Sequence, residues 1–223
     1  MMRTTVAQRV RVTFGVGGPL IYLSVLDMGR LWERLARRAR LPLAYTQGFH
    51  PHPRMQFAAA LPVGYGSTCE LLDLLLAEAL TPAAFLAMAA PHCPPGLALL
   101  GAEEVPLQAP LPQARMQSAH YQVDVDTPQT PAQLNAALAA LLERDTIPRA
   151  RRRKREQTTA YDLRPLIHSI TAEGGDDGHH TLHMVLHCGS QGAGRPEEVL
   201  AELGLVPSRI CRTRLVWEEG DNP

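Results

Sequence analysis

The sequence predicts an α+β protein with two halves, each having the element order β-α-β-β-α-β. Two observations support this prediction. Segments of alternating polar and apolar residues, which are typical of strands, are separated by segments with the apolar spacing and the caps of helices. This order occurs twice along the 223 residues, before and after a stretch rich in proline and glutamine at 108–118.

In the first half, residues 8–15 alternate, and a glycine cluster ends this strand. Ser24 is a suitable N-cap with Asp27 three residues later, and apolar residues then recur at helical spacing until Pro42. The remaining expected elements are strands at 43–46, 55–61, 69–76 and 97–105 and a helix at 82–90 that Thr81 caps.

The second half begins with an alternating strand at 120–125 and an alanine- and leucine-rich helix at 131–144, for which Thr130 is the cap. Residues 147–155 and 158–167 predict a hairpin, whose second arm extends to 173. The final expected elements are a glycine-rich turn at 174–178, a strand at 179–188, a helix at 196–203 and a strand at 210–217.

This repeated order is the split βαβ pattern of the ferredoxin-like fold. We therefore expect two tandem ferredoxin-like halves with antiparallel sheets, at 1–107 and 119–223, joined by a linker at 108–118. The second half has room for one extra strand.

The composition limits the class of protein. Net charge is zero, so the chain has no global bias toward nucleic acid or membrane, although 21 of its 22 basic residues are arginine, which suits bidentate phosphate contacts. No apolar run approaches the roughly 20 residues of a membrane span, and no secretory signal is evident, so we expect a cytoplasmic protein without membrane contact. The four cysteines include no C-x-x-C pair, and we predict neither a metal nor a cofactor.

The turn from Gln47 to Arg54, Gln-Gly-Phe-His-Pro-His-Pro-Arg, is the most unusual local feature. Pro51 and Pro53 lack a backbone donor and restrict the residues before them to extended geometry. We therefore expect His50 and His52 to lie in a stiff, extended segment and to project to the same side.

This turn is a candidate RNA-binding site. Phe49 can stack on a base, Gln47 or His52 can bond to base edges, and Arg54 can hold a phosphate. The alternative interpretation is a rigid crossover that fixes the next strand and places Phe49 in the core. A further alternative is that His50 or His52 acts as a general acid or base on a scissile phosphate, as in some RNA-processing endonucleases with paired ferredoxin-like domains.

Two groups of basic residues are candidate phosphate contacts. The first is a run of six positive charges within seven residues, and its alternative is a solvated loop. The second is a helix face on which Glu33 offers an ion-pair partner to Arg37. The run consists of Arg149, Arg151, Arg152, Arg153, Lys154 and Arg155, and the face of Arg30, Arg34, Arg37 and Arg38.

Two other patterns are less specific. Asp162 and Arg164 alternate on a segment expected to be extended, so they share one face and either form a salt bridge or contribute to the RNA site. His179, His183 and His187 share one face of a strand, but the outer two are roughly 13 Å apart at the rise of a strand. One metal ion cannot be bound by all three, so ordinary sheet histidines are expected.

The motifs also resemble a known family. The run YLSVLDMGRLWERLARRARLPLAYTQGFHPHPRMQFAAALPVGYGS, followed by YDLRPLI at 161–167 and RTRL at 212–215, is similar to the bacterial radical-SAM-linked family, a domain of unknown function found alone or fused C-terminal to radical-SAM modules. Val25 and His50 depart from this family's pattern, where histidine and asparagine respectively are frequent. The resemblance implies an association with radical-SAM chemistry and makes RNA a candidate substrate.

The chain lacks C-x-x-x-C-x-x-C, so it cannot supply the three-cysteine cluster that radical-SAM chemistry uses. We therefore expect a non-catalytic accessory protein that binds RNA and acts with a separate radical-SAM enzyme. The alternatives are a metal-independent RNA endonuclease that uses His50 or His52, and a protein–protein adaptor for the radical-SAM partner.

Overall fold

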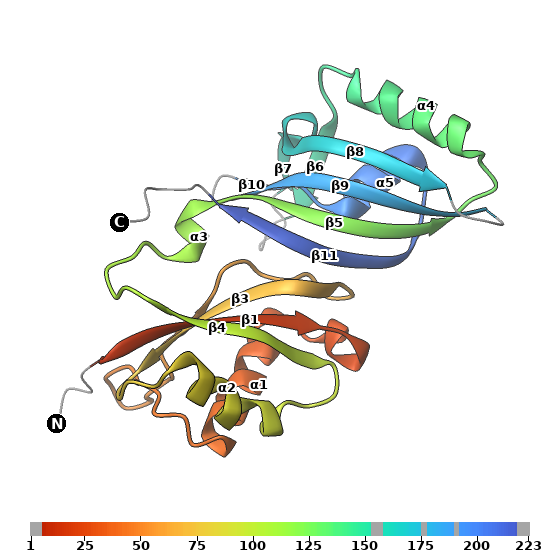
Figure 1. The fold of residues 1–223 in the computed structure, drawn as a ribbon. Coiled ribbons are helices and arrows are strands. Elements are labelled where there is room, and N and C mark those ends of the chain that lie inside the picture. Colours follow the sequence, from red (N-terminus) through yellow and green to blue (C-terminus); the bar gives the residue numbers. More distant parts are fainter. Residues whose placement is uncertain (1–5, 153–157, 175–177, 190–191, 218–223) are drawn as a thin grey trace. The chain divides into compact units, whose positions relative to one another are not determined.

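The computed structural model describes residues 6–152, 158–174, 178–189 and 192–217. The chain has an α+β architecture in which helices cover one face of antiparallel sheets (Figure 1). It divides into two compact units, Met1–Arg115 and Met116–Pro223. No helix in the described part of the chain is long and apolar enough to cross a membrane.

The first unit contains an antiparallel sheet with the strand order β4-β1-β3-β2, and helices α1 and α2 lie on one face of it (Figure 1). Its elements are β1 (Gln8–Val16), η1 (Gly18–Tyr22), α1 (Val25–Arg38), β2 (Met55–Phe57), β3 (Gly66–Leu76), α2 (Pro82–Ala89), η2 (Ala90–His92), β4 (Leu97–Val105) and α3 (Pro112–Arg115).

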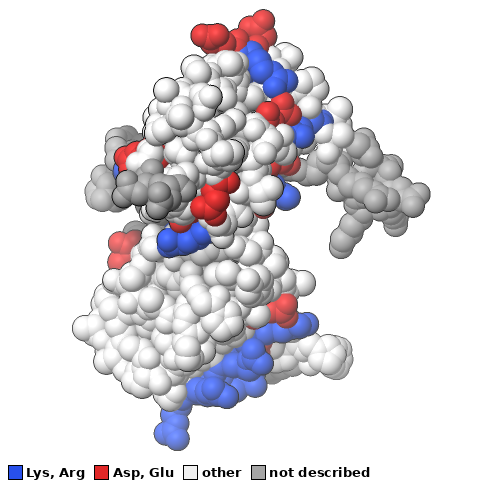
Figure 2. Space-filling model, turned by 90° about the vertical axis from the view of Figure 1, so that its right-hand side faces the viewer, with Lys and Arg blue, Asp and Glu red and all other residues white. Residues whose placement is uncertain are grey.

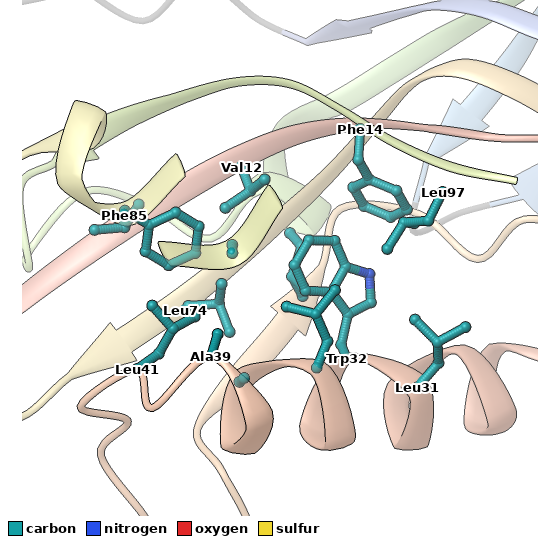
Figure 3. Close-up of a cluster of buried hydrophobic side chains, with 14 of the residues drawn as sticks. Val12, Phe14, Leu31, Trp32, Ala39, Leu41, Leu74, Phe85 and Leu97 are labelled. Carbon is teal, nitrogen blue, oxygen red and sulfur yellow. The ribbon is translucent and has the colours of Figure 1, made fainter. Parts of the chain in front are cut away.

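The core of this unit forms between β1 and the apolar stripe of α1. Ser24 is the N-cap, and its hydroxyl accepts a hydrogen bond from the Asp27 backbone N–H at 3.2 Å. One turn further on, Trp32 is fully buried, and its ring meets Phe14 edge to face with centroids 5.1 Å apart (Figure 3). Such pairs contribute about 0.5–1.5 kcal/mol beyond their buried area. The packing therefore fixes α1 against the sheet.

Side chains bind part of the stretch at 108–118, where a linker is predicted, to the rest of the first unit. This stretch contains α3 and the first residues of the second unit, and the first unit holds it with side chains. The buried Arg9 donates from Nη1 to the carbonyl oxygen of Ala109 at 2.6 Å, and Gln113 donates to the carbonyl oxygen of Phe57 at 2.7 Å. Composition alone cannot reveal bonds made by residues about a hundred positions away.

Two strands of the first unit also differ from their predicted extent. The strand expected at 55–61 ends at Phe57, and the segment at 43–46 makes only isolated bridges, between Leu43 and Leu76 and between Tyr45 and Pro53. Pro53 has no N–H to donate, which limits pairing on this side.

The second unit contains an antiparallel sheet with the strand order β11-β5-β9-β8, in which β10 extends the β8 edge, and a separate two-stranded hairpin, β6-β7. Helices α4 and α5 cover one face of the larger sheet (Figure 1). The elements are β5 (Met116–Asp126), α4 (Pro131–Leu142), β6 (Pro148–Arg152), β7 (Thr158–Asp162), η3 (Arg164–Leu166), β8 (Ile167–Gly174), β9 (His179–Gly189), β10 (Gly192–Ala193), α5 (Pro196–Leu203) and β11 (Pro207–Trp217).

Local capping signals position α4 as expected. Thr130 and Gln133 form a reciprocal capping box, and Leu134 and Leu138 are buried beneath the helix. The predicted second arm of the hairpin is interrupted, because a 3-10 turn at Arg164–Leu166 separates β7 from β8. The extra pair of strands is therefore a distinct hairpin.

Candidate functional site

The turn from Gln47 to Arg54 is a short hairpin-like loop whose two arms are bonded to each other. The Thr46 N–H donates to the carbonyl oxygen of His52 at 2.8 Å, and the His52 N–H donates to Oγ1 of Thr46 at 2.9 Å. Further down, the Arg54 N–H donates to the carbonyl oxygen of Ala44 at 2.8 Å. The base of the loop is thus held in place while its tip extends away.

The tip of the turn is open to solvent. Phe49 is 100% exposed, and Gln47, His50, His52 and Arg54 are exposed as well. The alternative that buries Phe49 in the core is therefore wrong. Uniform extended geometry is also absent, because residues 47–50 form a bend and Gly48 has a φ of +131°, which favours glycine. The bend turns the aromatic ring outward.

The two histidines of the turn lack the partners of an acid–base pair. Within the described residues, the rings of His50 and His52 form no hydrogen bond or ion pair, and the bonds of His52 are made by its backbone. A general acid or base works within hydrogen-bond reach of a reacting group and is usually oriented by another side chain. The geometry therefore gives no specific support to catalysis by either ring.

Half of the arginines on the α1 face are paired with acidic residues one turn away. Arg30 contacts Asp27 at 3.0 Å, and Arg37 contacts Glu33 at 2.8 Å. The hydrogen bond from Ser24, aided by Arg30, lowers the pKa of the Asp27 carboxyl below its usual value. These pairs are exposed and stabilise the helix only weakly.

The other arginines of this region have no such partner. Arg34 and Arg38 on α1, Arg40 just after it and Arg54 at the end of the turn are exposed, and they form no ion pair within the described part of the chain. Figure 2 shows Lys and Arg side chains gathered over the lower end of the view, where Figure 1 places α1. The first unit therefore presents exposed arginines that form no ion pair within the described residues, although Asp27 interacts electrostatically with Arg34.

The basic run begins with an arginine that the protein uses structurally. Arg149 on β6 donates from Nη2 to the carbonyl oxygen of Glu198 at 2.5 Å and contacts Oε1 of Glu202 at 3.1 Å. The other oxygen of Glu202 binds Arg144 at 2.5 Å. Arg149 thus fastens the hairpin to α5, and Nη2 of its guanidinium is engaged within the second unit.

The rest of the run gives less information. Arg151 and Arg152 end β6, where they pair with Thr159 and Thr158. Their side chains, together with the residues Arg153, Lys154 and Arg155, lie outside the described residues. The run belongs to the second unit, whereas the turn belongs to the first.

Arg164 and Asp162 do not share a face of an extended segment, because η3 begins between them. The Arg164 guanidinium donates from Nε to the carbonyl oxygen of Leu142 at 2.9 Å, at the end of α4, and from Nη1 to that of Ile167 at 3.1 Å. The backbone N–H groups of Ile147 and Arg164 donate to Asp162 and lower the pKa of its carboxyl. Both side chains therefore hold connections between elements.

The three histidines of β9 lie on one face of the strand, and each has a different neighbour. No three His, Cys, Asp or Glu side chains within the described residues are grouped as metal ligands. The hydrogen bond that the His179 ring donates to the Asp126 carboxylate raises the pKa of His179. The neighbours are Asp126 for His179 (2.8 Å), Glu173 for His183 (3.5 Å) and the ring of His168 for His187 (5.9 Å between centroids).

A groove of about 490 Å³ lies beside Arg34 and Arg38, and residues 91–95 form its other wall. The sequence analysis did not single out this segment. Its signal is the Pro-His-Cys-Pro-Pro cluster, in which three prolines within five residues indicate a rigid loop directly after a helix.

The fold and these surfaces define a two-unit α+β protein with an exposed aromatic turn and an arginine-rich helix. The chain matches the family DUF2344, described as an uncharacterized protein conserved in bacteria, over residues 9–196, and it belongs to this family. Comparison with curated proteins finds no match.

Two solved structures show a distant likeness. One, titled "Crystal Structure of a Cbf5-Nop10-Gar1 Complex", aligns with a TM-score of 0.49 and 7% identity over 95% of this chain, which spans 50% of that chain's length. Another, titled "Crystal structure of putative glycine cleavage system transcriptional repressor", aligns with a TM-score of 0.24 and 10% identity over 95% of this chain and 98% of the other.

Proposed function

We propose that this protein is a non-catalytic accessory protein that binds RNA and acts with a separate radical-SAM enzyme. The observation that carries the RNA proposal is the fully exposed Phe49 at the tip of a turn whose base is hydrogen-bonded. Leaving a phenylalanine side chain in water forgoes about 1.5–3 kcal/mol of burial. A stacked base recovers a comparable free energy, about 1–3 kcal/mol.

The charges of the first unit support the same ligand. Arg54 is the last residue of the turn, and Arg40 precedes the arm that leads into it. Both are exposed and without an ion-pair partner among the described residues, so a phosphate backbone can bind them without displacing a carboxylate. The exposed Gln47 adds donors and an acceptor for base edges.

We also propose that each unit is a ferredoxin-like half. The strand order is β4-β1-β3-β2 in the first unit and β11-β5-β9-β8 in the second. Both orders place the first of four strands between the third and the fourth, with the second strand beyond the third. The β6-β7 hairpin is then an insertion between the first helix and the second strand of the second unit. This architecture hosts many functions, so the RNA proposal depends on the surfaces of the protein.

The radical-SAM partner is proposed from the resemblance of the run Tyr22–Ser67 to the radical-SAM-linked family. Because the sequence contains no C-x-x-x-C-x-x-C, the iron–sulfur cluster would belong to the partner enzyme. This chain would bind the substrate and present it.

The experiment is filter binding of total cellular RNA at two salt concentrations. We expect retention that falls with salt, and about tenfold weaker binding for Phe49→Ala. Tyr22→Ala is the matched control, because Tyr22 is an exposed aromatic residue outside the turn, and it should bind like the unchanged protein. Equal binding by all three proteins, or no retention at low salt, contradicts the proposal.

Two further measurements separate the alternatives. RNA cleavage in chelator that disappears in His52→Ala identifies an endonuclease and contradicts the non-catalytic role. Co-purification with the radical-SAM enzyme after nuclease treatment, without any RNA retention, identifies an adaptor.

A further inference from the structure

The groove beside α1 combines two charged side chains with apolar walls. On the helix side it is lined by Arg34 and Arg38 and by the buried Leu31 and Leu35. The opposite wall is the segment from Pro91 to Pro95, which includes the last two residues of η2 and leads toward β4. Its volume of about 490 Å³ lies within the range of small-molecule sites, about 300–1,000 Å³.

The two arginines of this groove face no carboxylate in its lining. Arg34 and Arg38 are four residues apart, so their side chains lie on the same face of α1. No Asp or Glu is among the residues that line the groove. The acidic residues of α1, Asp27 and Glu33, are bound to Arg30 and Arg37. A bound anion would therefore meet two guanidinium groups that form no ion pair within the described residues. Asp27 also interacts electrostatically with Arg34, but it does not line the groove.

The opposite wall consists of three prolines together with His92 and Cys93. Pro91, Pro94 and Pro95 have fixed φ angles and offer flat apolar rings. Burial raises the pKa of the Cys93 thiol, and its Sγ lies 3.7 Å from the carbonyl oxygen of Ala89, as a hydrogen-bond donor. Cys93 is thus a neutral thiol, which suits contact with a ring and not with a second anion.

We propose that this groove binds a nucleoside monophosphate, with its phosphate on Arg34 and Arg38 and its base and sugar against the leucine and proline surfaces. A pair of guanidinium groups favours a phosphate dianion over a single carboxylate, because each can make a bidentate contact with phosphate oxygens. The nucleotide is either free or the 5′-terminal nucleotide of an RNA. The groove is separate from the turn at Gln47–Arg54, so either proposal can fail alone.

The test uses Cys93 as an internal reporter. The full-length protein is treated with iodoacetamide, and alkylation of each cysteine is followed by mass spectrometry with adenosine 5′-monophosphate, inorganic phosphate or adenosine present. We expect the monophosphate to slow alkylation of Cys93 while leaving Cys69 and Cys188, which are also partly buried and form no disulfide, unaffected. Phosphate and adenosine alone should protect at least tenfold less at equal concentration.

Matched variants complete the test. The double variant Arg34→Gln, Arg38→Gln should raise the nucleotide concentration needed for protection at least tenfold. The control Arg195→Gln, Arg209→Gln removes the same charge from exposed arginines of the second unit, outside the groove, and leaves Asp27 and Glu33 paired, so it should protect normally. Thermal unfolding checks that both variants are folded.

Two arms distinguish the sources of the nucleotide. Protection by a 5′-phosphorylated oligoribonucleotide but not by its 5′-hydroxyl form indicates an RNA end, and protection by the monophosphate alone indicates a free nucleotide. The proposal is overturned if adenosine and its monophosphate protect equally, if no probe protects, or if the two double variants have equal effects.

Discussion

Replacing Asp73 by asparagine tests the buried charge cluster of the first unit. Asp73 on β3 lies opposite Arg11 on β1, and its carboxylate accepts hydrogen bonds from both Arg9 and Arg11. The Nε atoms of these arginines are each 2.8 Å from it. Arg9 and Asp73 are each 3% exposed, so water cannot replace the lost partner.

The expected magnitude follows from that burial. Removing one member of a buried ion pair costs about 3–5 kcal/mol, because the remaining charge stays desolvated. Here two guanidinium groups lose their common counter-charge, although Arg9 keeps its bonds to the carbonyl oxygens of Ala109 and Pro110. We therefore expect Asp73→Asn to lower the free energy of unfolding of the first unit by about 3 kcal/mol or more.

The assay is equilibrium unfolding in urea, followed by tryptophan fluorescence. Trp32 is fully buried in the first unit, whereas Trp217 in the second is already 38% exposed, so the main change in emission reports the first unit. Glu33→Gln is the control, because its exposed pair with Arg37 contributes about 0.3–0.5 kcal/mol. A loss for Asp73→Asn no larger than the control's would refute the reasoning.

Three other perturbations have defined outcomes. Trp32→Phe removes a buried indole N–H that has no partner within the described residues. Removing this unsatisfied donor offsets part of the packing that is lost, so circular dichroism melting should show a loss in the free energy of unfolding below about 2 kcal/mol. Gly96→Ala should cost at least about 2 kcal/mol in the same assay, because Gly96 has a φ of +94° and the new Cβ would lie 2.3 Å from the carbonyl oxygen of Gly17. In an NMR titration, Asp126→Asn should move the pKa of His179 down toward its ordinary value of 6.5, and a pKa unchanged in this variant would contradict the assigned pair. Since the folded pKa of His179 is raised, the stabilisation from this pair is present below about pH 6.5 and lost as pH rises through the folded pKa.

Elements with a short-range cause were predictable from the sequence. The Ser24 cap, the Thr130 cap and the proline-started helix at Pro196–Leu203 all depend on residues within one turn of each other. Strand ends and connections depend on distant partners. The early end of β2 at Phe57 and the fixing of residues 109–110 by Arg9 have no local signal, because the residues concerned are far apart in the chain.

The features of the candidate site also divide into those with local causes and those that depend on distant partners. The sequence indicated the Gln47–Arg54 turn and the pairing of Glu33 with Arg37, since both follow from neighbouring residues. It did not reveal that Phe49 is fully exposed, or that Arg149 and Arg164 bind carbonyl groups of other elements. The sequence alone does not distinguish an arginine whose guanidinium is solvated from one whose guanidinium binds carbonyl groups of another element.

The hydrogen bonds of Arg9 to the segment after β4 have a practical consequence for the design of fragments of this protein. A fragment that stops at residue 107 would lack the carbonyl groups of Ala109 and Pro110 and would leave part of a buried guanidinium without acceptors. It would also lack Gln113, which bonds to the backbone of Phe57. An isolated amino-terminal fragment should therefore end after Arg115. If a shorter fragment aggregates, the cause is the loss of these hydrogen bonds and not an intrinsic inability of the unit to fold.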